Sequence, residues 1–258
     1  MAVGYRQKEV IMFHFFVEKD QIDEESGILT ITGSDVNHIR QVLRMKAGEE
    51  IRVSNREDKD YHCELVCVEN DRVEAKILGV MENTELPVKI YLFQGLPKSD
   101  KMELIIQKAV ELGVYEIIPV ATRRAVVKLE GKKEASKVAR WNAISESAAK
   151  QSKRLLVPRV TNVMSLKEAF QYASGFDKNL IPYENARGIE GTREEFSAIV
   201  PGMQVGIFVG PEGGFDEEEV RLAMDSHVKP VTLGKRILRT ETAGMFVLSV
   251  LGFQLEGK

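Results

Sequence analysis

Phe208-Val-Gly-Pro-Glu-Gly-Gly-Phe215 and Leu233-Gly-Lys-Arg-Ile-Leu-Arg-Thr-Glu-Thr-Ala-Gly244 are glycine-rich stretches, each following a predicted apolar strand and preceding a predicted helix. The glycines of the first stretch let the backbone come close to a ligand, while its proline stiffens the turn. This pattern predicts a cradle for a small, partly polar molecule. Neither a strand followed by Gly-x-Gly-x-x-Gly nor the spaced glycine of a phosphate loop is present, so neither a dinucleotide nor a nucleoside triphosphate is implied.

Apolar strands alternate with amphipathic helices on both sides of the first stretch. The predicted strands are 88–93, 116–120, 179–182, 205–209 and 230–233, and the predicted helices are about 100–112, 136–153 and 241–255. Asp100 with Glu103 predicts a capping box, and Gly113 predicts a helix end. The acidic run 216–219 is interpreted as the capped start of another helix. This alternation predicts an α/β domain with a parallel sheet.

The first eighty residues have a different pattern, with short alternating runs at 13–17, 28–32, 51–54, 61–68 and 72–78. Such runs predict a small β-barrel. One helix interrupts it, starting after the N-cap candidate Ser34 or Asp35 and ending before Gly48. Residues 82–87 form the predicted linker between the two parts, which we place at 12–82 and 87–258.

Composition narrows the class of protein. At 258 residues and 43% hydrophobic content, the chain can form one large domain or two smaller ones. No stretch approaches the roughly 18 uncharged apolar residues of a membrane span, and residues 1–10 lack the apolar core of a signal peptide. We therefore expect a cytoplasmic protein with no membrane partner.

The sequence also predicts no metal site and no disulfide. Cys63 and Cys67 lie four residues apart in a predicted strand. That spacing puts them on one face about 13 Å apart, too far for one disulfide or one zinc tetrahedron. The four histidines show no ligand spacing.

Charge is unevenly distributed. The net charge is only −3, but residues 123–159 carry eleven basic and three acidic side chains. A local basic stripe is typical of phosphate-backbone contact, and Arg40, Arg44 and Lys46 belong to a second, weaker cluster. The alternative for either cluster is an ordinary solvated surface.

The last predicted helix, 241–255, is apolar nearly all round. Such a helix must be buried on several faces. In a domain of this size, that requirement indicates a subunit interface as well as a core.

The two glycine stretches resemble the cofactor loops of the SPOUT superfamily of RNA methyltransferases, and most closely the family that methylates N3 of a uridine in 16S ribosomal RNA. Further motifs of the resemblance are His38-Ile-Arg-Gln-Val-Leu-Arg-Met-Lys-Ala-Gly48 and Gly95-Leu-Pro-Lys-Ser-Asp-Lys-Met-Glu-Leu-Ile-Ile-Gln-Lys-Ala-Val-Glu-Leu-Gly113. The middle of the chain adds Glu116-Ile-Ile-Pro-Val120, Arg123, Arg140-Trp141, Gln151-Ser152, Arg154 and Pro158. Chains of this family usually begin near Met12, so we interpret residues 1–11 as an extension or a misplaced start.

The resemblance implies a PUA-like RNA-binding barrel followed by a SPOUT α/β domain with a trefoil knot, in a homodimer whose active sites lie at the subunit boundary. It also implies S-adenosyl-L-methionine as the cofactor. Loop amides can bind its adenine and ribose, apolar side chains can enclose the adenine, and its sulfonium needs no metal. The candidate cofactor-binding residues are Val209, Gly210, Pro211, Glu212, Gly213, Gly214, Leu233, Gly234, Ile237, Leu238 and Thr240.

Methyl transfer to uracil N3 requires loss of the imide proton, and positioning supplies much of the rest. Cations near the uracil oxygens would stabilise the negative charge, and Arg123, Arg236 and Arg239 are the candidates. Glu212 or Glu241 could accept the proton, or either could instead cap backbone amides.

RNA contacts are predicted for two groups of residues: Arg40, Arg44 and Lys46 of the barrel, and Arg124, Gln151 and Arg154 of the basic stretch. The first hypothesis is N3 methylation of one uridine of 16S ribosomal RNA in the small subunit. The alternatives are a SPOUT methyltransferase acting on tRNA or 23S ribosomal RNA, and a non-catalytic RNA-binding assembly factor. The intact glycine loops speak against the last of these.

Overall fold

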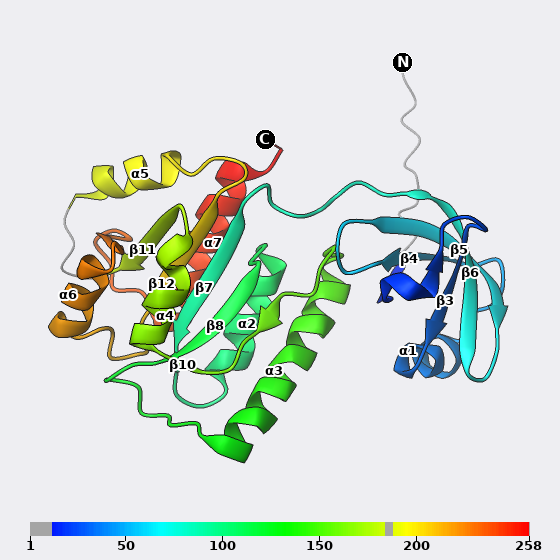
Figure 1. Ribbon diagram of the computed structural model, residues 1–258, viewed down its shortest axis with the longest axis horizontal. Coiled ribbons are helices and arrows are strands. Elements are labelled where there is room, and N and C mark those ends of the chain that lie inside the picture. Colours follow the sequence, from blue (N-terminus) through cyan, green and yellow to red (C-terminus); the bar gives the residue numbers. More distant parts are fainter. Residues whose placement is uncertain (1–11, 184–187, 258) are drawn as a thin grey trace. The chain divides into compact units, whose positions relative to one another are not determined.

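The computed structural model describes residues 12–183 and 188–257, and the chain divides into two compact units, the first ending at Thr84 and the second beginning at Glu85 (Figure 1). The suspected extension, residues 1–11, lies outside the described residues. No helix of the described part is long and apolar enough to cross a membrane.

The N-terminal unit is a curled six-stranded sheet around one hydrophobic core (Figure 1). Its strands, in the order β1-β4-β5-β6-β3-β2, are β1 (Phe13–Phe16), β4 (Glu50–Ser54), β5 (Asp60–Val68), β6 (Arg72–Val80), β3 (Ile28–Thr32) and β2 (Ile22–Asp23). The β1–β4 pair is parallel and the other pairs are antiparallel. Alternate side chains such as Leu29, Ile31, Ile51 and Val53 point inward, as the period of two predicts.

The helix predicted in this unit differs from expectation. It begins at Ser34 after the N-cap Gly33, so neither Ser34 nor Asp35 is the N-cap. The first turn, α1 (Ser34–Asn37), continues into the wider π-type segment η2 (His38–Leu43), which ends at Arg44 with a left-handed φ of 56°. A short 3-10 turn, η1 (Lys19–Gln21), precedes β2.

The C-terminal unit is a seven-stranded sheet in which every pair is parallel, as predicted. Its main order is β10-β8-β7-β12-β11-β13, with β9 beside β8. The strands are β7 (Lys89–Gly95), β8 (Glu116–Ala121), β9 (Arg159–Val160), β10 (Met164–Ser165), β11 (Lys178–Pro182), β12 (Gln204–Val209) and β13 (Lys229–Val231). Because β12 returns between β7 and β11, the strand order reverses at the centre of the sheet.

The helices of this unit are α2 (Lys101–Glu111), α3 (Gly131–Gln151), α4 (Leu166–Tyr172), α5 (Ile189–Ser197), α6 (Glu217–Asp225) and α7 (Thr240–Leu255), with a 3-10 turn, η3 (Ala173–Gly175), after α4. Helices α4 and α6 pack on the sheet face that carries the stacked rings of Phe93 and Phe208. Helix α7 lies on the opposite face, where a Cβ on Gly244 would lie 3.8 Å from Leu92, and α2 packs against both α7 and α3 (Figure 1).

Two capping predictions have different outcomes. Asp216 caps α6 and forms a capping box with Glu219, as predicted. The capping box at α2 is wrong, because Asp100 makes no side-chain cap and Glu103 instead accepts two hydrogen bonds from Arg140. Gly113 does follow the end of α2 with a φ of 90°, and a Cβ there would lie 2.6 Å from Leu86 Cδ1.

Candidate functional site

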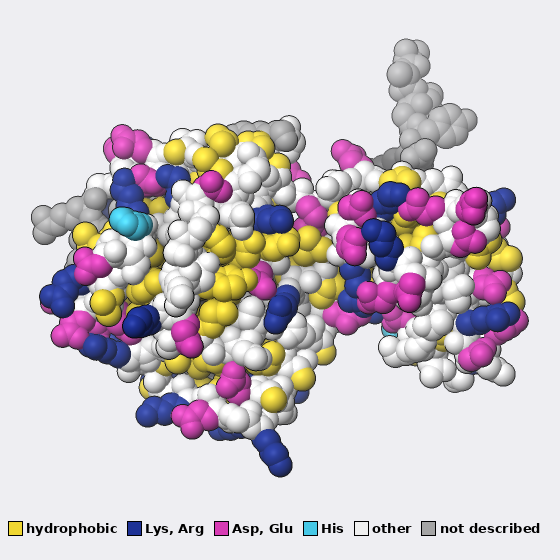
Figure 2. All heavy atoms as spheres, viewed as in Figure 1, with side chains coloured by type: hydrophobic (Ala, Val, Ile, Leu, Met, Phe, Trp, Pro, Cys, Tyr) yellow, Lys and Arg dark blue, Asp and Glu magenta, His cyan; other side chains and the backbone are white. Residues whose placement is uncertain are grey.

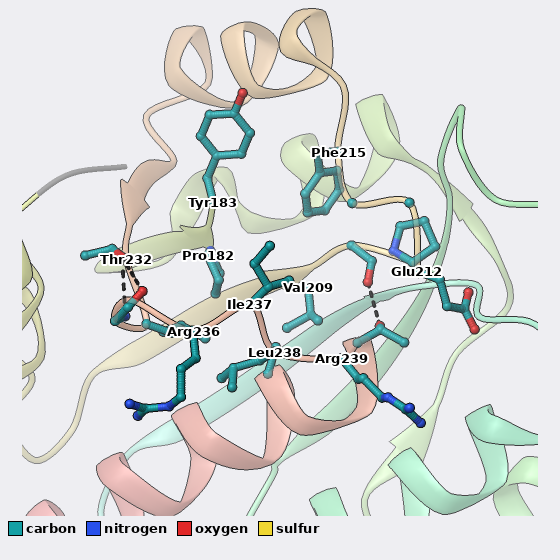
Figure 3. Close-up of a pocket in the computed structure, with 18 of the residues that line it drawn as sticks. Pro182, Tyr183, Val209, Glu212, Phe215, Thr232, Arg236, Ile237, Leu238 and Arg239 are labelled. Atoms are coloured by element: carbon teal, nitrogen blue, oxygen red, sulfur yellow. Dashed lines mark hydrogen bonds between the residues drawn. The ribbon is translucent and has the colours of Figure 1, made fainter. Parts of the chain in front are cut away.

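A pocket of about 450 Å³ lies at the carboxyl ends of β11 and β12 and in the segment after β13, where the strand order has reversed (Figure 3). Parallel α/β sheets bind ligands at this edge, and the volume is in the range of small-molecule sites. All eleven candidate cofactor-binding residues line this pocket. The pocket also contains residues without a predicted role: Lys101, Pro182, Tyr183, Phe215, Thr232, Lys235 and Ala243.

The first loop of the pocket, 210–214, is tight enough to need glycine. Its turn is closed by a hydrogen bond of 2.9 Å from the Gly214 amide to the Pro211 carbonyl, and Gly214 has a φ of 65°. A Cβ on Gly210 would lie 3.0 Å from the Gly214 carbonyl carbon. A Cβ on Gly95, at the end of β7, would lie 2.7 Å from Pro211 Cδ. The backbone of the loop is therefore packed directly on β7.

The second loop, 232–239, supplies the apolar part of the pocket. Thr232 accepts a hydrogen bond of 3.3 Å from the Gly234 amide, and Gly234 has a φ of 110° that favours glycine. Ile237 and Leu238 lie beside Val209 in the middle of the pocket (Figure 3). Ile237 is 85% exposed, so an apolar side chain faces solvent at a ligand-sized cavity.

A buried polar network joins both loops to the sheet. Gln94 Nε2 donates to Thr240 Oγ1 at 2.9 Å, and Thr240 Oγ1 donates to the Gly210 carbonyl at 2.6 Å. Gln94 is fully buried and Thr240 is 5% exposed. The network ties the end of β7, the first loop and the start of α7 together. Sequence reasoning missed Gln94, although a polar residue directly after the apolar run 88–93 was a usable signal.

The two glutamates proposed for proton transfer share one cation. Lys101 Nζ lies 3.1 Å from Glu212 Oε1 and 3.4 Å from Glu241 Oε2. Both Glu212 oxygens also accept the Lys98 amide, at 3.1 and 3.2 Å. Partial burial acts to raise the pKa of Glu212, but hydrogen bonds from backbone amides and Lys101 outweigh it and lower that pKa below its ordinary value. Glu241 does not line the pocket.

The three candidate arginines lie at different places relative to the pocket. Arg236 and Arg239 line the pocket, and their guanidinium groups point outward from it (Figure 3). Within the described ranges, neither has an acidic partner at salt-bridge distance. Arg123 lies outside the pocket lining and pairs with Asp216 and Glu218, and the hydrogen bond to Glu218 raises the pKa of its guanidinium. The Arg123 side chain thus contacts the first turn of α6 and not the pocket.

The predicted RNA-contact residues of the basic stretch also differ from one another. Arg124 is exposed and donates to the Gly213 carbonyl at 2.8 Å, so it contacts the first loop. Gln151 is exposed at the end of α3. Arg154 differs from both, since its side chain is only 4% exposed and binds Glu85 together with the carbonyls of Val110 and Val114. These contacts are all within the protein.

Part of the basic stretch is paired with acids from another segment of the chain. Arg140 pairs with Glu103 and Lys137 with Asp100, whereas Lys150 pairs with Glu146 one turn away on its own helix. Basic and acidic side chains are interspersed over the face shown in Figure 2, without one continuous basic area. Counting charges within 123–159 therefore left out the acids that pair with Arg140 and Lys137.

The three candidates of the N-terminal unit lie near its shallow groove, which Arg40 and Lys46 line together with Met45, Ala47 and residues 66–68. Arg40 donates to Asn70 Oδ1 at 2.5 Å. Arg44 and Lys46 are exposed, but Arg44 is not part of the groove lining. Among the described residues, no group of three or more His, Cys, Asp or Glu could hold a metal ion.

Two family models match the chain: an RNA methyltransferase domain over residues 84–252 and an RNA methyltransferase PUA domain over residues 31–78. The parallel sheet with its loop-lined pocket and the separate curled sheet thus define the class as an RNA methyltransferase with a PUA domain.

Individual relatives narrow the class. Ribosomal RNA small subunit methyltransferase E of Bacillus subtilis is 42% identical over 95% of this chain and 98% of its own length. The protein of that name from Mesomycoplasma hyopneumoniae is 35% identical over 92% of this chain and 98% of its own. The crystal structure of the Neisseria gonorrhoeae protein of that name, bound to S-adenosyl methionine, matches with a TM-score of 0.81 and 32% identity, over 94% of this chain and 98% of its own. This chain belongs to the ribosomal RNA small subunit methyltransferase E family.

Proposed function

We propose that this protein transfers the methyl group of S-adenosyl-L-methionine to N3 of one uridine in the 16S ribosomal RNA of the small subunit. The observation that carries the proposal is the pocket edge, where two glycine loops meet the exposed guanidinium groups of Arg236 and Arg239. The printed names of the relatives favour small-subunit ribosomal RNA over tRNA or 23S ribosomal RNA. The non-catalytic alternative has no observation in its favour.

The residues of the pocket fit the cofactor. Gly214 and Gly234 line the pocket, and a Cβ added at either would meet no protein atom within 4 Å, so a ligand can come close to the backbone of both loops. Val209, Ile237 and Leu238 offer apolar surface for an adenine ring, and loop amides offer donors and acceptors for its polar edge. When bound, S-adenosyl-L-methionine supplies an electrophilic methyl group on its sulfonium.

The chain's own residues have to orient the uracil and stabilise its deprotonated form. Arg239 and Arg236 line the solvent-exposed edge of the pocket, where they would offset negative charge on the uracil oxygens as the N3 proton passes to solvent water. Glu212 and Glu241 are already paired with Lys101, so we assign both to holding the loop and not to proton transfer. Arg123 is assigned to the α6 start, and Arg124 stays a candidate RNA contact because it is exposed beside the first loop.

The remaining parts of the proposal concern the whole protein. The N-terminal unit would contact RNA through Arg40, Arg44 and Lys46, giving affinity and register but no chemistry. We further propose a cytoplasmic homodimer, supported by the exposed apolar side chains of Ile237, Phe246 and Phe253. The trefoil knot of the SPOUT superfamily belongs to the same proposal.

The test is incubation with methyl-labelled S-adenosyl-L-methionine and, separately, unmodified small subunits, naked 16S ribosomal RNA and bulk tRNA, followed by nucleoside identification. Label recovered as 3-methyluridine from 16S ribosomal RNA is the expected result. Label in tRNA would overturn the substrate, and bound cofactor without label would overturn the enzyme.

Arg239→Ala gives the matching residue test. We expect turnover to fall roughly 10²- to 10³-fold while cofactor affinity is kept, as when a charge-stabilising donor is removed. Arg221→Ala, the same change at an exposed site on α6, is the control and should keep full turnover. Full activity of Arg239→Ala would remove Arg239 from the active site.

A further inference from the structure

Lys101 occupies a position that its own helix does not favour. It is the first residue of α2, and a positive charge at a helix N-terminus opposes the helix dipole. Two residues earlier, Ser99 has a left-handed φ of 57°, an unfavourable conformation for a residue with a side chain. The turn before α2 is thus strained, and it places the Lys101 ammonium at a position where the charge does not stabilise α2.

The turn makes its contacts with the cofactor pocket instead. The Lys98 amide donates to both oxygens of Glu212, and Lys101 Nζ reaches Glu212 at 3.1 Å and Glu241 at 3.4 Å. Glu212 belongs to the first glycine loop, and Glu241 to the first turn of α7, two residues after Arg239. One side chain therefore joins α2, the cofactor loop and the helix that follows the proposed uracil-binding arginine.

Partial burial makes the loss of the Lys101 ammonium more costly than the loss of one partner of a surface ion pair. The side chains of Lys101, Glu212 and Glu241 are 33%, 27% and 15% exposed. Glu241 Oε2 is buried and has no hydrogen-bond partner, and among the described residues Lys101 is the one cation at salt-bridge distance from it. Without that ammonium, a shielded carboxylate would stay uncompensated and would repel the neighbouring Glu212.

We infer that Lys101 is a positioning residue for methyl transfer, which holds the loop 210–214 against the start of α7 through Glu212 and Glu241. The inference rests on the proposed function only for the effect of Lys101 on methyl transfer to RNA. The effect of Lys101 on cofactor binding does not depend on the RNA substrate. Lys101 keeps a constant spacing between the loop that cradles the cofactor and Arg239, which approaches the base. It acts on the reaction through these two carboxylates.

The test compares Lys101→Met and Lys101→Arg with the wild-type protein, using calorimetric titration with S-adenosyl-L-methionine and methyl transfer to small subunits at saturating cofactor. Lys101→Met is expected to weaken cofactor binding roughly tenfold, within the usual range of coupling between neighbouring charged groups, and to lower kcat as well. Lys101→Arg keeps the charge and should recover most of both. The control Lys108→Met removes a lysine of α2 that pairs with Glu111 and should change neither quantity.

A double-mutant cycle separates positioning from a general loss of structure. In a Glu212→Gln, Glu241→Gln background, Lys101→Met should weaken cofactor binding less than twofold further, because the carboxylates through which Lys101 acts are gone. A full tenfold additional loss in that background, or wild-type affinity and kcat in Lys101→Met itself, would overturn the inference. The thermal midpoint of each variant shows whether it is folded.

Cofactor affinity also distinguishes this inference from the proposed function. Suppose that no RNA substrate accepts label but the wild-type protein binds S-adenosyl-L-methionine. The proposed activity is then wrong, and the double-mutant cycle on cofactor affinity still tests the role of Lys101 in the loop. If the wild-type protein does not bind the cofactor, both the proposed function and this inference are wrong.

Discussion

Gly95 lies where β7 meets the first pocket loop, and it shows how a single missing side chain shapes the site. A Cβ there would lie 2.7 Å from Pro211 Cδ and 2.8 Å from Pro211 N. These are loop atoms with little freedom, so Gly95→Ala must displace the loop. We expect affinity for S-adenosyl-L-methionine to fall roughly tenfold, equivalent to the cost of modest overpacking.

The control for Gly95→Ala is Gly191→Ala on α5, because a Cβ at Gly191 meets nothing within 4 Å. Calorimetric titration of both variants checks the prediction. Equal affinities would mean that the first loop can shift without consequence for the ligand.

Arg154 is a basic residue whose side chain is buried and paired inside the protein. It is 4% exposed, and its Nε donates a hydrogen bond of 2.8 Å to Glu85. Its guanidinium also donates to two backbone carbonyls near the end of α2. Arg154→Met would leave Glu85 and those carbonyls short of donors. We expect the free energy of unfolding to fall by about 3 kcal/mol, as for other broken buried ion pairs.

Urea unfolding measures this change, with Lys132→Met on the exposed side of α3 as a control that should cost less than about 0.5 kcal/mol. Where the variant is folded, the salt dependence of its RNA binding should match that of the wild-type protein. A flatter slope would return Arg154 to the RNA-contact residues.

At the scale of elements, one carboxylate of α5 forms ion pairs with two strands of the sheet. Glu195 accepts hydrogen bonds from Lys178, which begins β11, and from Lys229, which begins β13, and these bonds lower the pKa of Glu195. A lowered folded-state pKa means that the stabilisation is present above the unfolded value of about 4.3 and is lost as the pH falls through the lower folded value.

Glu195→Gln is therefore expected to lower the free energy of unfolding by about 1 kcal/mol near neutral pH. The difference from the wild-type protein should shrink steadily as the pH falls below the unfolded value. Glu190→Gln, on the exposed side of the same helix, should have almost no effect at any pH. A difference that persists undiminished in acid would show that the ion pairs are not its cause.

At the scale of the whole molecule, α7 carries the observation that supports a dimer. Its apolar surface is only partly used within the chain, since Val247, Leu248 and Leu251 are buried while Phe253 is 91% exposed and Phe246 is 38% exposed. Phe246 and Phe253 lie seven residues apart and share one helix face. We propose that a second copy of the chain packs against this face of α7.

Phe253→Gln should weaken self-association roughly 10- to 100-fold, which corresponds to the loss of one buried aromatic side chain. Sedimentation equilibrium over a range of concentrations measures this change. Met224→Gln, which alters an exposed apolar residue of α6, is the control. A wild-type protein that stays monomeric at high concentration would contradict the dimer.

The sequence by itself determined the alternation of elements, the parallel sheet, the curled N-terminal sheet and the two glycine loops. These features depend on local periodicity and on backbone freedom, which neighbouring residues encode. The short elements β9, β10, α4 and α5 were not predicted, because segments of two to nine residues carry too little periodic signal.

Only the tertiary structure decided which charges are free. Arg123, Arg140 and Arg154 look alike as basic residues in the chain, yet each is paired with an acid 37 to 95 residues away. The contacts of Lys101 with Glu212 and Glu241, and of Gln94 with Thr240, likewise join positions more than one hundred residues apart. Pairing over such distances depends on strand order and packing, because local pattern contains no information about which distant side chain will lie within 4 Å.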